Sequence, residues 1–280
     1  MKIIKRVRAP VRIDFGGGTT DIKPFTHTHG GAVLNATINR YVEGRLMAAD
    51  KSVSLEYHGN IPTSSGLGTS GVMNLVWLAL ISKIRNKNEL AEKVYGLEQA
   101  MGLVGGKQDQ YASAFGGINL MEFKKDKVKI TKLNLNKNFV KEFEKRLVLV
   151  YMGKPHFSGH TNKLAIENLK KGKNVKNLIR LKEIAIEMKK ALLKKDLDKF
   201  GELMNEETKE RDMLHKVTIA ETSERYIKEG MKNGAIASKI CGSGGGGSIL
   251  YFVENRKKLV KKFKGKVIDF KFDFKGLQWL

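Results

Sequence analysis

A short polar segment, residues 60–71, does most to limit what this chain can fold into. It joins a β-rich run at 53–58 to an apolar run of helical length at 72–81. A strand, a tight turn and a helix N-terminus in that order form an anion-binding site, because the first N–H groups of a helix lack intrahelical partners and the helix dipole favours negative charge. Glycines in the turn would let the backbone approach a phosphate closely. The segment therefore predicts a phosphate-binding loop.

The better-known kinds of phosphate loop do not fit this segment. Gly66, Gly68 and Gly71 match G-x-G-x-x-G, but a dinucleotide fold also needs a series of βαβ units that the surrounding sequence lacks. A Walker loop ends in Gly-Lys-Ser/Thr, whereas Gly68 is followed by Thr69 and Ser70. The H-R-D motif of protein kinases is absent. A helix N-cap with flexible glycines is the structural alternative; otherwise this is a phosphate loop of another kind, rich in hydroxyl groups.

The composition excludes several classes of protein. A net charge of +23 suggests nucleic-acid binding, but the lysines are spread along the chain and no RNA-binding or zinc-finger motif accompanies them. A single cysteine, Cys241, excludes a disulfide framework and a cysteine-based metal cluster. No apolar run reaches the ~18 residues of a membrane span, and the basic N-terminus lacks the apolar core of a signal peptide. We therefore expect a cytoplasmic protein with no nucleic-acid or membrane partner.

Hydrophobic patterns divide the chain into two α+β halves, at 1–150 and 151–280. A chain of 280 residues is long enough for two modest domains. The second half opens with a long helical tract at 160–232, in which apolar residues recur at i, i+3 and i+4. The expected strands lie at 32–48, 53–58, 118–123, 128–133, 147–151, 235–240, 248–252 and 267–272, and the helices of the first half follow residue 68 and span 89–101.

Two further glycine-rich turns lie near the ends of the chain. Residues 10–24 begin as a strand, break at three glycines and close with two threonines and Asp21, polar groups that can bind sugar hydroxyls. Residues 239–248 join two apparent strands through more glycines than a hairpin needs. Between these turns, a helix with one apolar face runs into a Gly-Gly turn followed by Asp109, which could equally be an ordinary helix N-cap.

These segments, in this order, resemble the GHMP small-molecule kinases, and within that family the D-glycero-D-manno-heptose 7-phosphate kinases and related sugar 1-kinases. The resemblance covers almost the whole chain. It implies a two-domain α+β fold: an N-terminal mixed-sheet domain with a left-over-right phosphate loop before a helix, and a C-terminal α+β sandwich domain. The segments that carry it lie at 12–18, 29–39, 65–70, 106–111, 151–158 and 242–247.

The resemblance also implies roles for individual residues, with ATP and Mg²⁺ as cofactors. Asp109 matches the family's catalytic aspartate, and Arg12 falls where the family has a basic residue near the transferred phosphoryl group. ATP would be bound by Ser64, Ser65, Gly66, Leu67, Gly68, Thr69 and Ser70, and Mg²⁺ by Ser70 and Glu98. The substrate would be bound by Gly18, Thr20, Asp21, Gly106, Gln108, Gly244 and Gly245.

Phosphoryl-transfer chemistry is consistent with these roles. The reaction needs charge neutralisation at the phosphates and an aligned acceptor hydroxyl. Mg²⁺ prefers a few oxygen ligands in addition to phosphate, which one hydroxyl and one carboxylate provide. A carboxylate beside the acceptor can take its proton, and Arg12 or Lys107 nearby would keep Asp109 ionised.

The chain departs from the heptose kinases at three places. Thr19 stands where they usually have a glycine, and Gly71 replaces the small alanine or serine that commonly follows the loop. The stretch between His58 and Pro62 is short, whereas heptose kinases carry an additional helical segment there.

The expected function is ATP-dependent phosphorylation of a sugar or sugar phosphate, at the anomeric hydroxyl. Lys154 and His156 could bind a substrate phosphate, or could equally form a solvated strand end. One alternative is a kinase of the same fold for another alcohol, such as galactose, fucose, mevalonate or homoserine. A second is a non-catalytic protein that binds nucleic acid or an acidic partner.

Overall fold

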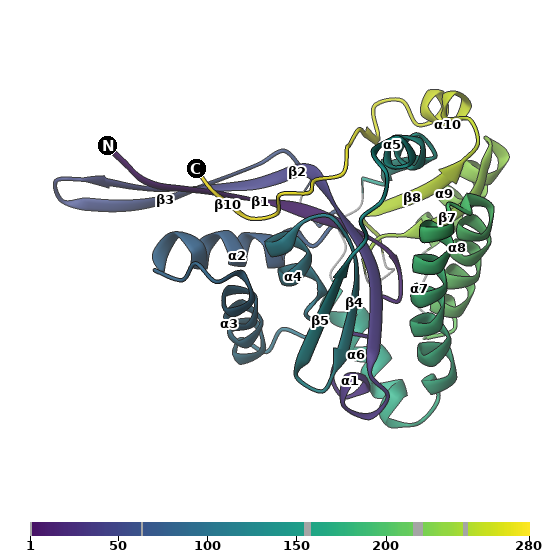
Figure 1. Ribbon diagram of the computed structural model, residues 1–280, viewed down its shortest axis with the longest axis horizontal. Coiled ribbons are helices and arrows are strands. Elements are labelled where there is room, and N and C mark those ends of the chain that lie inside the picture. The colour runs from purple at the N-terminus through teal and green to yellow at the C-terminus, as the bar shows by residue number, and fades with distance from the viewer. Residues whose placement is uncertain (1, 63, 154–157, 215–220, 243–245) are drawn as a thin grey trace.

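The computed structural model describes residues 2–62, 64–153, 158–214, 221–242 and 246–280 (Figure 1). Its larger sheet has the strand order β10-β1-β2-β4-β5. The long strand β2 pairs with β4 along its first part and with β3 along its last part. The strands of this sheet are β1 (Lys2–Gly16), β2 (Gly31–Ala49), β3 (Ser52–Gly59), β4 (Ile118–Lys124), β5 (Lys127–Lys132) and β10 (Gln278–Trp279).

Neighbouring strands of the larger sheet run in opposite directions throughout its described part. The sheet is therefore antiparallel rather than mixed. Three of its pairs, β1–β2, β2–β3 and β4–β5, join strands that follow one another along the chain. The pairs β2–β3 and β4–β5 are connected by short turns, which favour antiparallel neighbours. The strand β10 returns from the end of the chain to pair with β1.

The smaller sheet has the order β7-β8-β6-β9 and is also antiparallel in its described pairs. Most of its strands lie where the sequence predicts them. The strand expected at 267–272 is an exception, because only two of its residues pair with the sheet. The strands are β6 (Leu147–Tyr151), β7 (Ala235–Ile240), β8 (Ser248–Val253) and β9 (Val267–Ile268).

The helical tract predicted at 160–232 is divided into separate helices. Gly172 follows the first of them in the left-handed conformation, and Lys195 ends the next in the same conformation. Asp196 then caps a new helix by accepting a hydrogen bond from Lys199 N. The helices are α1 (Phe25–Thr28), α2 (Thr69–Ile81), α3 (Lys87–Ala100), α4 (Gln108–Phe115), α5 (Lys137–Lys145), α6 (Ser158–Lys170), α7 (Val175–Lys194), α8 (Leu197–Asp212), α9 (Glu221–Lys232) and α10 (Arg256–Lys262).

The helices are arranged in layers around the sheets (Figure 1). Helices α2 and α4 pack on one side of the larger sheet and α7 on the other, while α8 packs against both α7 and β7. Strands β1, β2 and β3 also extend away from the body as a ribbon. Among the described residues, no helix combines the length and the apolar character that crossing a bilayer requires.

One apolar core joins the two sheets. The ring of Phe143, on α5, lies 5.4 Å from that of Phe15 on β1 and 4.9 Å from that of Phe200 on α8. Phe200 in turn packs 5.7 Å from Phe252 on β8. Aromatic pairs at these separations add to the hydrophobic stabilisation of a core. Continuous packing of this kind holds the two halves in one relative position, and the domain boundary near residue 150 stays a prediction.

Candidate active site

A pocket of about 400 Å³ brings together residues from well-separated parts of the chain. Its walls come from β1 and the turn that follows it, the loop before α2, helix α3, and the segment that leads into α4. The polar side chains of the lining are Arg12, Thr19, Asp21, Ser64, Ser65, Thr69, Ser70, Glu98, Gln108, Asp109, Gln110 and Asn162. The glycines of the lining are Gly66, Gly68, Gly71, Gly105, Gly106 and Gly242.

The loop before α2 has the features of an anion site. Gly66 and Gly68 both have positive φ, +77° and +76°, which side chains rarely adopt, and Gly68 is the N-cap of α2. Within the described part of the chain, no side chain caps this helix, and the buried hydroxyls of Ser65 and Thr69 have no hydrogen-bond partner. Unpaired donors at a helix N-terminus fit the oxygens of a phosphate. The loop therefore fits the phosphates of ATP.

Arg12 connects this loop to Asp109. Its Nε and Nη2 atoms both lie 2.8 Å from Asp109 Oδ1, and its Nη1 donates to Gly66 O at 2.7 Å. Burial works to lower the pKa of the Arg12 guanidinium, but the charges of Asp109 and Asp14 outweigh it and raise the pKa above its ordinary value. Arg12 thus stays charged while it holds the carboxylate against the loop.

Asp109 is not the N-cap of α4. Lys107 occupies that position, and Asp109 is the second residue of the helix. Two glycines make room for it, since a Cβ on Gly68 or Gly71 would lie 3.0 Å from atoms of the Asp109 side chain. Of the two cations expected beside Asp109, Arg12 contacts it, whereas Lys107 Nζ binds both oxygens of Glu92 at 2.8 Å.

Glu98 and Ser70, the proposed metal ligands, line the same pocket. Glu98 Oε1 accepts from Asn74 Nδ2 at 2.8 Å, and Oε2 accepts from Gln110 Nε2. Burial, helped by the nearby charge of Asp109, raises the pKa of the Glu98 carboxyl. A cation would relieve this cost, and with one carboxylate and one hydroxyl it would take its remaining ligands from phosphate and water, as Mg²⁺ does.

Asp21 ties the turn after β1 to the start of α4. Its Oδ2 accepts a hydrogen bond from Gln108 N at 3.0 Å, while the buried Oδ1 has no partner among the residues that the structure describes. Burial is the largest influence on this carboxyl and raises its pKa to about 6, although the Gln108 N–H opposes it. A buried oxygen without a partner, at the wall of a pocket, is suited to accept a hydrogen bond from a bound hydroxyl.

Activity should therefore depend on the ionisation of Asp21. Above pH 6 the carboxylate can accept from both Gln108 N and a bound hydroxyl, whereas protonation at lower pH removes acceptor capacity. We expect kcat/KM for the acceptor to fall by about tenfold per pH unit well below pH 6. The measurement is the pH profile of kcat/KM in the wild type and in Asp21→Asn. An Asp21→Asn profile with the same acid limb would rule out this assignment.

Some predicted residues do not line the pocket. The Thr20 hydroxyl lies 2.6 Å from Gly17 O and 3.0 Å from Ala32 O and can donate to either of them. Leu67 is fully buried in the core, although its carbonyl accepts from Arg12 N at 3.1 Å. Gly18 O accepts from Arg211 Nη2 at 3.2 Å. Gly244 and Gly245, together with Lys154 and His156, lie outside the described residues.

Among the polar lining residues, Thr19, Gln110 and Asn162 are absent from the sequence prediction. Asn162 reaches the pocket from α6, where its Nδ2 donates to Val104 O at 3.0 Å. It lies in a helical tract without a motif, so nothing in the sequence distinguishes it. Thr19 lines the pocket with a φ of +76°. Its only signal in the sequence is that it replaces a glycine usual in heptose kinases.

Two family models match the chain. The model of the GHMP kinases N terminal domain matches residues 32–117, and the model of the GHMP kinases C terminal matches residues 188–266. The first range contains the phosphate loop and Asp109. The chain belongs to the GHMP kinase family. It is thus a kinase, which transfers a phosphoryl group from ATP to an alcohol.

Individual relatives agree with this membership. A D-glycero-alpha-D-manno-heptose 7-phosphate kinase of Campylobacter jejuni is 28% identical over 342 aligned positions, which cover 99% of each chain. The crystal structure of a D-glycero-D-manno-heptose 1-phosphate kinase from Bacteroides thetaiotaomicron is 26% identical, with a TM-score of 0.78 and 99% of each chain covered. The Methanococcus jannaschii mevalonate kinase, at 16% identity, TM-score 0.69 and coverage of 95% and 98%, shares the fold.

The Campylobacter relative is longer than this GHMP kinase. The alignment runs over 342 positions, and this chain has 280 residues, so the relative carries residues with no counterpart here. The sequence indicates one such place between His58 and Pro62. There, β3 ends at Gly59 and α2 begins at Thr69, so few residues separate the strand from the phosphate loop.

Proposed function

We propose that this GHMP kinase phosphorylates a sugar or sugar phosphate, at the anomeric hydroxyl. The observation that carries the proposal is the contact of Arg12 with both Asp109 and Gly66 O, because it joins a carboxylate to a phosphate loop inside one pocket. The substrate class follows from the relatives that act on heptose phosphates and from the polar turn beside the pocket.

The loop and Asp109 would divide the chemistry. Backbone N–H groups at the start of α2, with the Ser65 and Thr69 hydroxyls, bind the ATP phosphates. The contacts of Arg12 go to Asp109 Oδ1, so Oδ2 is the atom that receives the proton of the attacking hydroxyl. Arg12 then compensates the charge that develops on the transferred group.

Ser70 and Glu98 would hold Mg²⁺. When bound, the cation neutralises charge on the ATP phosphates and orients them. Asn74 and Gln110 fix the Glu98 carboxylate in place, so that this ligand is oriented before the metal arrives.

The acceptor would bind beside Asp21. Asp21 accepts from a sugar hydroxyl through its unpaired Oδ1, and Gly106 and Gln108 line the same wall. Gly18 and Thr20 belong to the turn that carries Asp21, and Gly244 and Gly245, which lie outside the described residues, keep their predicted role in substrate binding. We also propose a domain boundary near residue 150, and a cytoplasmic location, where ATP and sugar phosphates are at hand.

A panel of acceptors tests the proposed function. ADP release would be measured with D-glycero-D-manno-heptose 7-phosphate, fucose, galactose, mannose and mevalonate under identical conditions. We expect turnover with one of the sugars and none with mevalonate. Turnover with mevalonate alone would mean that the acceptor is another alcohol and not a sugar. Steeply salt-dependent RNA binding without turnover of any acceptor would favour the non-catalytic alternative.

The metal assignment predicts a specific defect in Glu98→Gln. The amide keeps the shape of the side chain but removes the charge that attracts the cation. We expect the Mg²⁺ concentration for half-maximal activity to rise at least about tenfold. Glu89→Gln is the matched control, because Glu89 lies on the same helix but is half exposed and pairs weakly with Lys93, at 3.9 Å. Equal Mg²⁺ dependence in both variants would contradict the assignment.

A further inference from the structure

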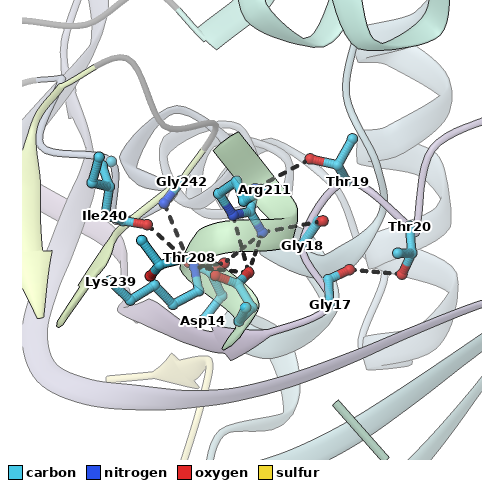
Figure 2. A network of polar contacts seen from close by, with 12 residues as sticks. Asp14, Gly17, Gly18, Thr19, Thr20, Thr208, Arg211, Lys239, Ile240 and Gly242 are labelled. Carbon is cyan, nitrogen blue, oxygen red and sulfur yellow. Dashed lines mark hydrogen bonds and ion pairs between the residues drawn. The ribbon is translucent and has the colours of Figure 1, made fainter. Parts of the chain in front are cut away.

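Four buried charged side chains meet in one network, in which Figure 2 labels Asp14, Arg211 and Lys239. Lys239 Nζ, from β7, lies 2.8 Å from Asp14 Oδ2 on β1 and 3.5 Å from Glu207 Oε1 on α8. Arg211, one turn further along α8, places Nη2 2.6 Å from the same Glu207 oxygen and 3.9 Å from Asp14 Oδ2. Each of the four residues is 3% exposed or less. We call them the ion cluster.

The charges of the ion cluster balance, with two carboxylates against two cations. Burial alone would raise the pKa of Asp14, but Lys239, Arg12 and Arg211 hold it well below its usual range. Buried ion pairs repay their desolvation poorly compared with apolar residues of the same size, so stability alone is a weak reason for such a cluster. Its geometry points to a positioning role instead.

The ion cluster reaches two segments of the pocket wall. Arg211 Nη2 donates to Gly18 O at 3.2 Å, and its Nη1 donates to Thr19 Oγ1 at 3.4 Å. On the other side, Asp14 Oδ1 accepts from Gly242 N at 3.2 Å. Thr19 and Gly242 both line the pocket. Figure 2 shows the guanidinium of Arg211 between Asp14 and the turn that carries Gly18 and Thr19.

This turn needs external support. Thr19 has a φ of +76°, a left-handed conformation that a β-branched residue adopts only where its surroundings impose it. Gly18 lies so close to the cluster that a Cβ there would be 2.8 Å from both Arg211 Nη2 and Asp14 Oδ2. Asp21, which closes the turn, carries the unpaired Oδ1 in the pocket. Arg211 is therefore in a position to fix the geometry of the wall that ends in Asp21.

We propose that Arg211 is a positioning residue for the acceptor, and that Asp14, Glu207 and Lys239 hold its guanidinium in place. Arg211 fixes the turn at 18–21 and so sets the affinity for the acceptor. Within the described residues, its hydrogen bonds and ion pairs go to this turn and to the ion cluster rather than to the ATP loop. The proposal rests on the proposed function in one respect, namely that this turn faces the acceptor. Arg211 donates to Gly18 O, Thr19 Oγ1 and Glu207 Oε1 at the same time. These contacts need the planar, several-donor guanidinium, which a lysine cannot replace.

The test compares Arg211→Lys with Arg180→Lys. Arg211→Lys keeps the charge balance of the cluster and loses the fork. Arg180→Lys makes the same change at an arginine that also binds carboxylates of α7 and α8, Glu187 and Glu206, each at 2.7 Å, but on the surface. Steady-state kinetics would use the best sugar of the acceptor panel, and amide hydrogen exchange would follow the Thr20 and Ile22 amides, which close the turn through bonds to Gly17 O and Thr19 O.

We expect Arg211→Lys to raise the acceptor KM about tenfold, with kcat and the KM for ATP within about twofold, and to speed exchange in the turn. Arg180→Lys should change none of these. An unchanged acceptor KM and unchanged exchange in folded Arg211→Lys would overturn the proposal, as would an equal rise in the KM for ATP. If the wild type phosphorylates no sugar, the proposed function fails, and exchange alone decides whether Arg211 holds the turn.

Discussion

Replacing Asp109 by asparagine is expected to lower kcat by about 10²–10⁴ while the fold and the affinity for ATP are kept. The amide has the same shape as the carboxylate, and its oxygen can still accept from Arg12, which now lies 2.8 Å from Oδ1. It cannot take a proton from the acceptor hydroxyl. The loss should therefore be in kcat, measured by ADP release, with circular dichroism and nucleotide binding unchanged.

Asp269→Asn is the control for this variant. Asp269 also pairs with an arginine, Arg256, at 3.2 Å, but its side chain is 81% exposed and lies away from the pocket. Asp269→Asn should turn over like the wild type. If Asp109→Asn also kept wild-type turnover with a well-formed fold, the catalytic assignment of Asp109 would be abandoned.

Elements with a strong local signal could be predicted from the sequence. The strand at 53–58 and the helix after Gly68 are where their apolar patterns and glycines place them. Helix α5, in contrast, is not among the predicted elements, although Asn136 caps it and its apolar residues recur at helical spacing. The sequence predicts the helical tract at 160–232 but not its division into helices. Gly172 and Lys195 end helices through left-handed conformations, which the periodicity of apolar residues does not reveal.

The candidate site also has a part that the sequence predicts and a part that it does not. The loop, Arg12, Glu98 and Asp109 belong to short motifs, and the structure brings them to one pocket. The fully engaged hydroxyl of Thr20 could not be foreseen, because its partners include Ala32, the second residue of another strand. The ion cluster joins residues 225 positions apart, from Asp14 to Lys239, without any local pattern. Only the tertiary packing of α8 and β7 against β1 makes it visible.

Gly66→Ala should disable the ATP loop. Gly66 has a φ of +77°, and a Cβ there would lie 2.5 Å from the backbone oxygen of Cys241. A backbone atom cannot rotate away as a flexible side chain can, so the loop itself must move. Its movement would also strain the 2.7 Å hydrogen bond from Arg12 to Gly66 O, which connects the loop to Asp109. We expect kcat/KM for ATP to fall by about 100-fold or more, the effect of a displacement near 1 Å at a reacting centre.

Gly172→Ala is the control that distinguishes the effect of loop displacement from the effect of backbone strain alone. Gly172 has a similar φ, +70°, but its Cβ would meet nothing within 4 Å, and the residue is exposed after α6. The alanine should therefore cost about 1–2 kcal/mol of stability, as left-handed residues do, and leave the kinetics alone. Thermal unfolding and ATP kinetics measured on both variants distinguish the two effects. If Gly66→Ala lost stability like Gly172→Ala but kept its ATP kinetics, the contact between the loop and Cys241 would have no part in nucleotide binding, and the loop would have to bind phosphate in some other conformation.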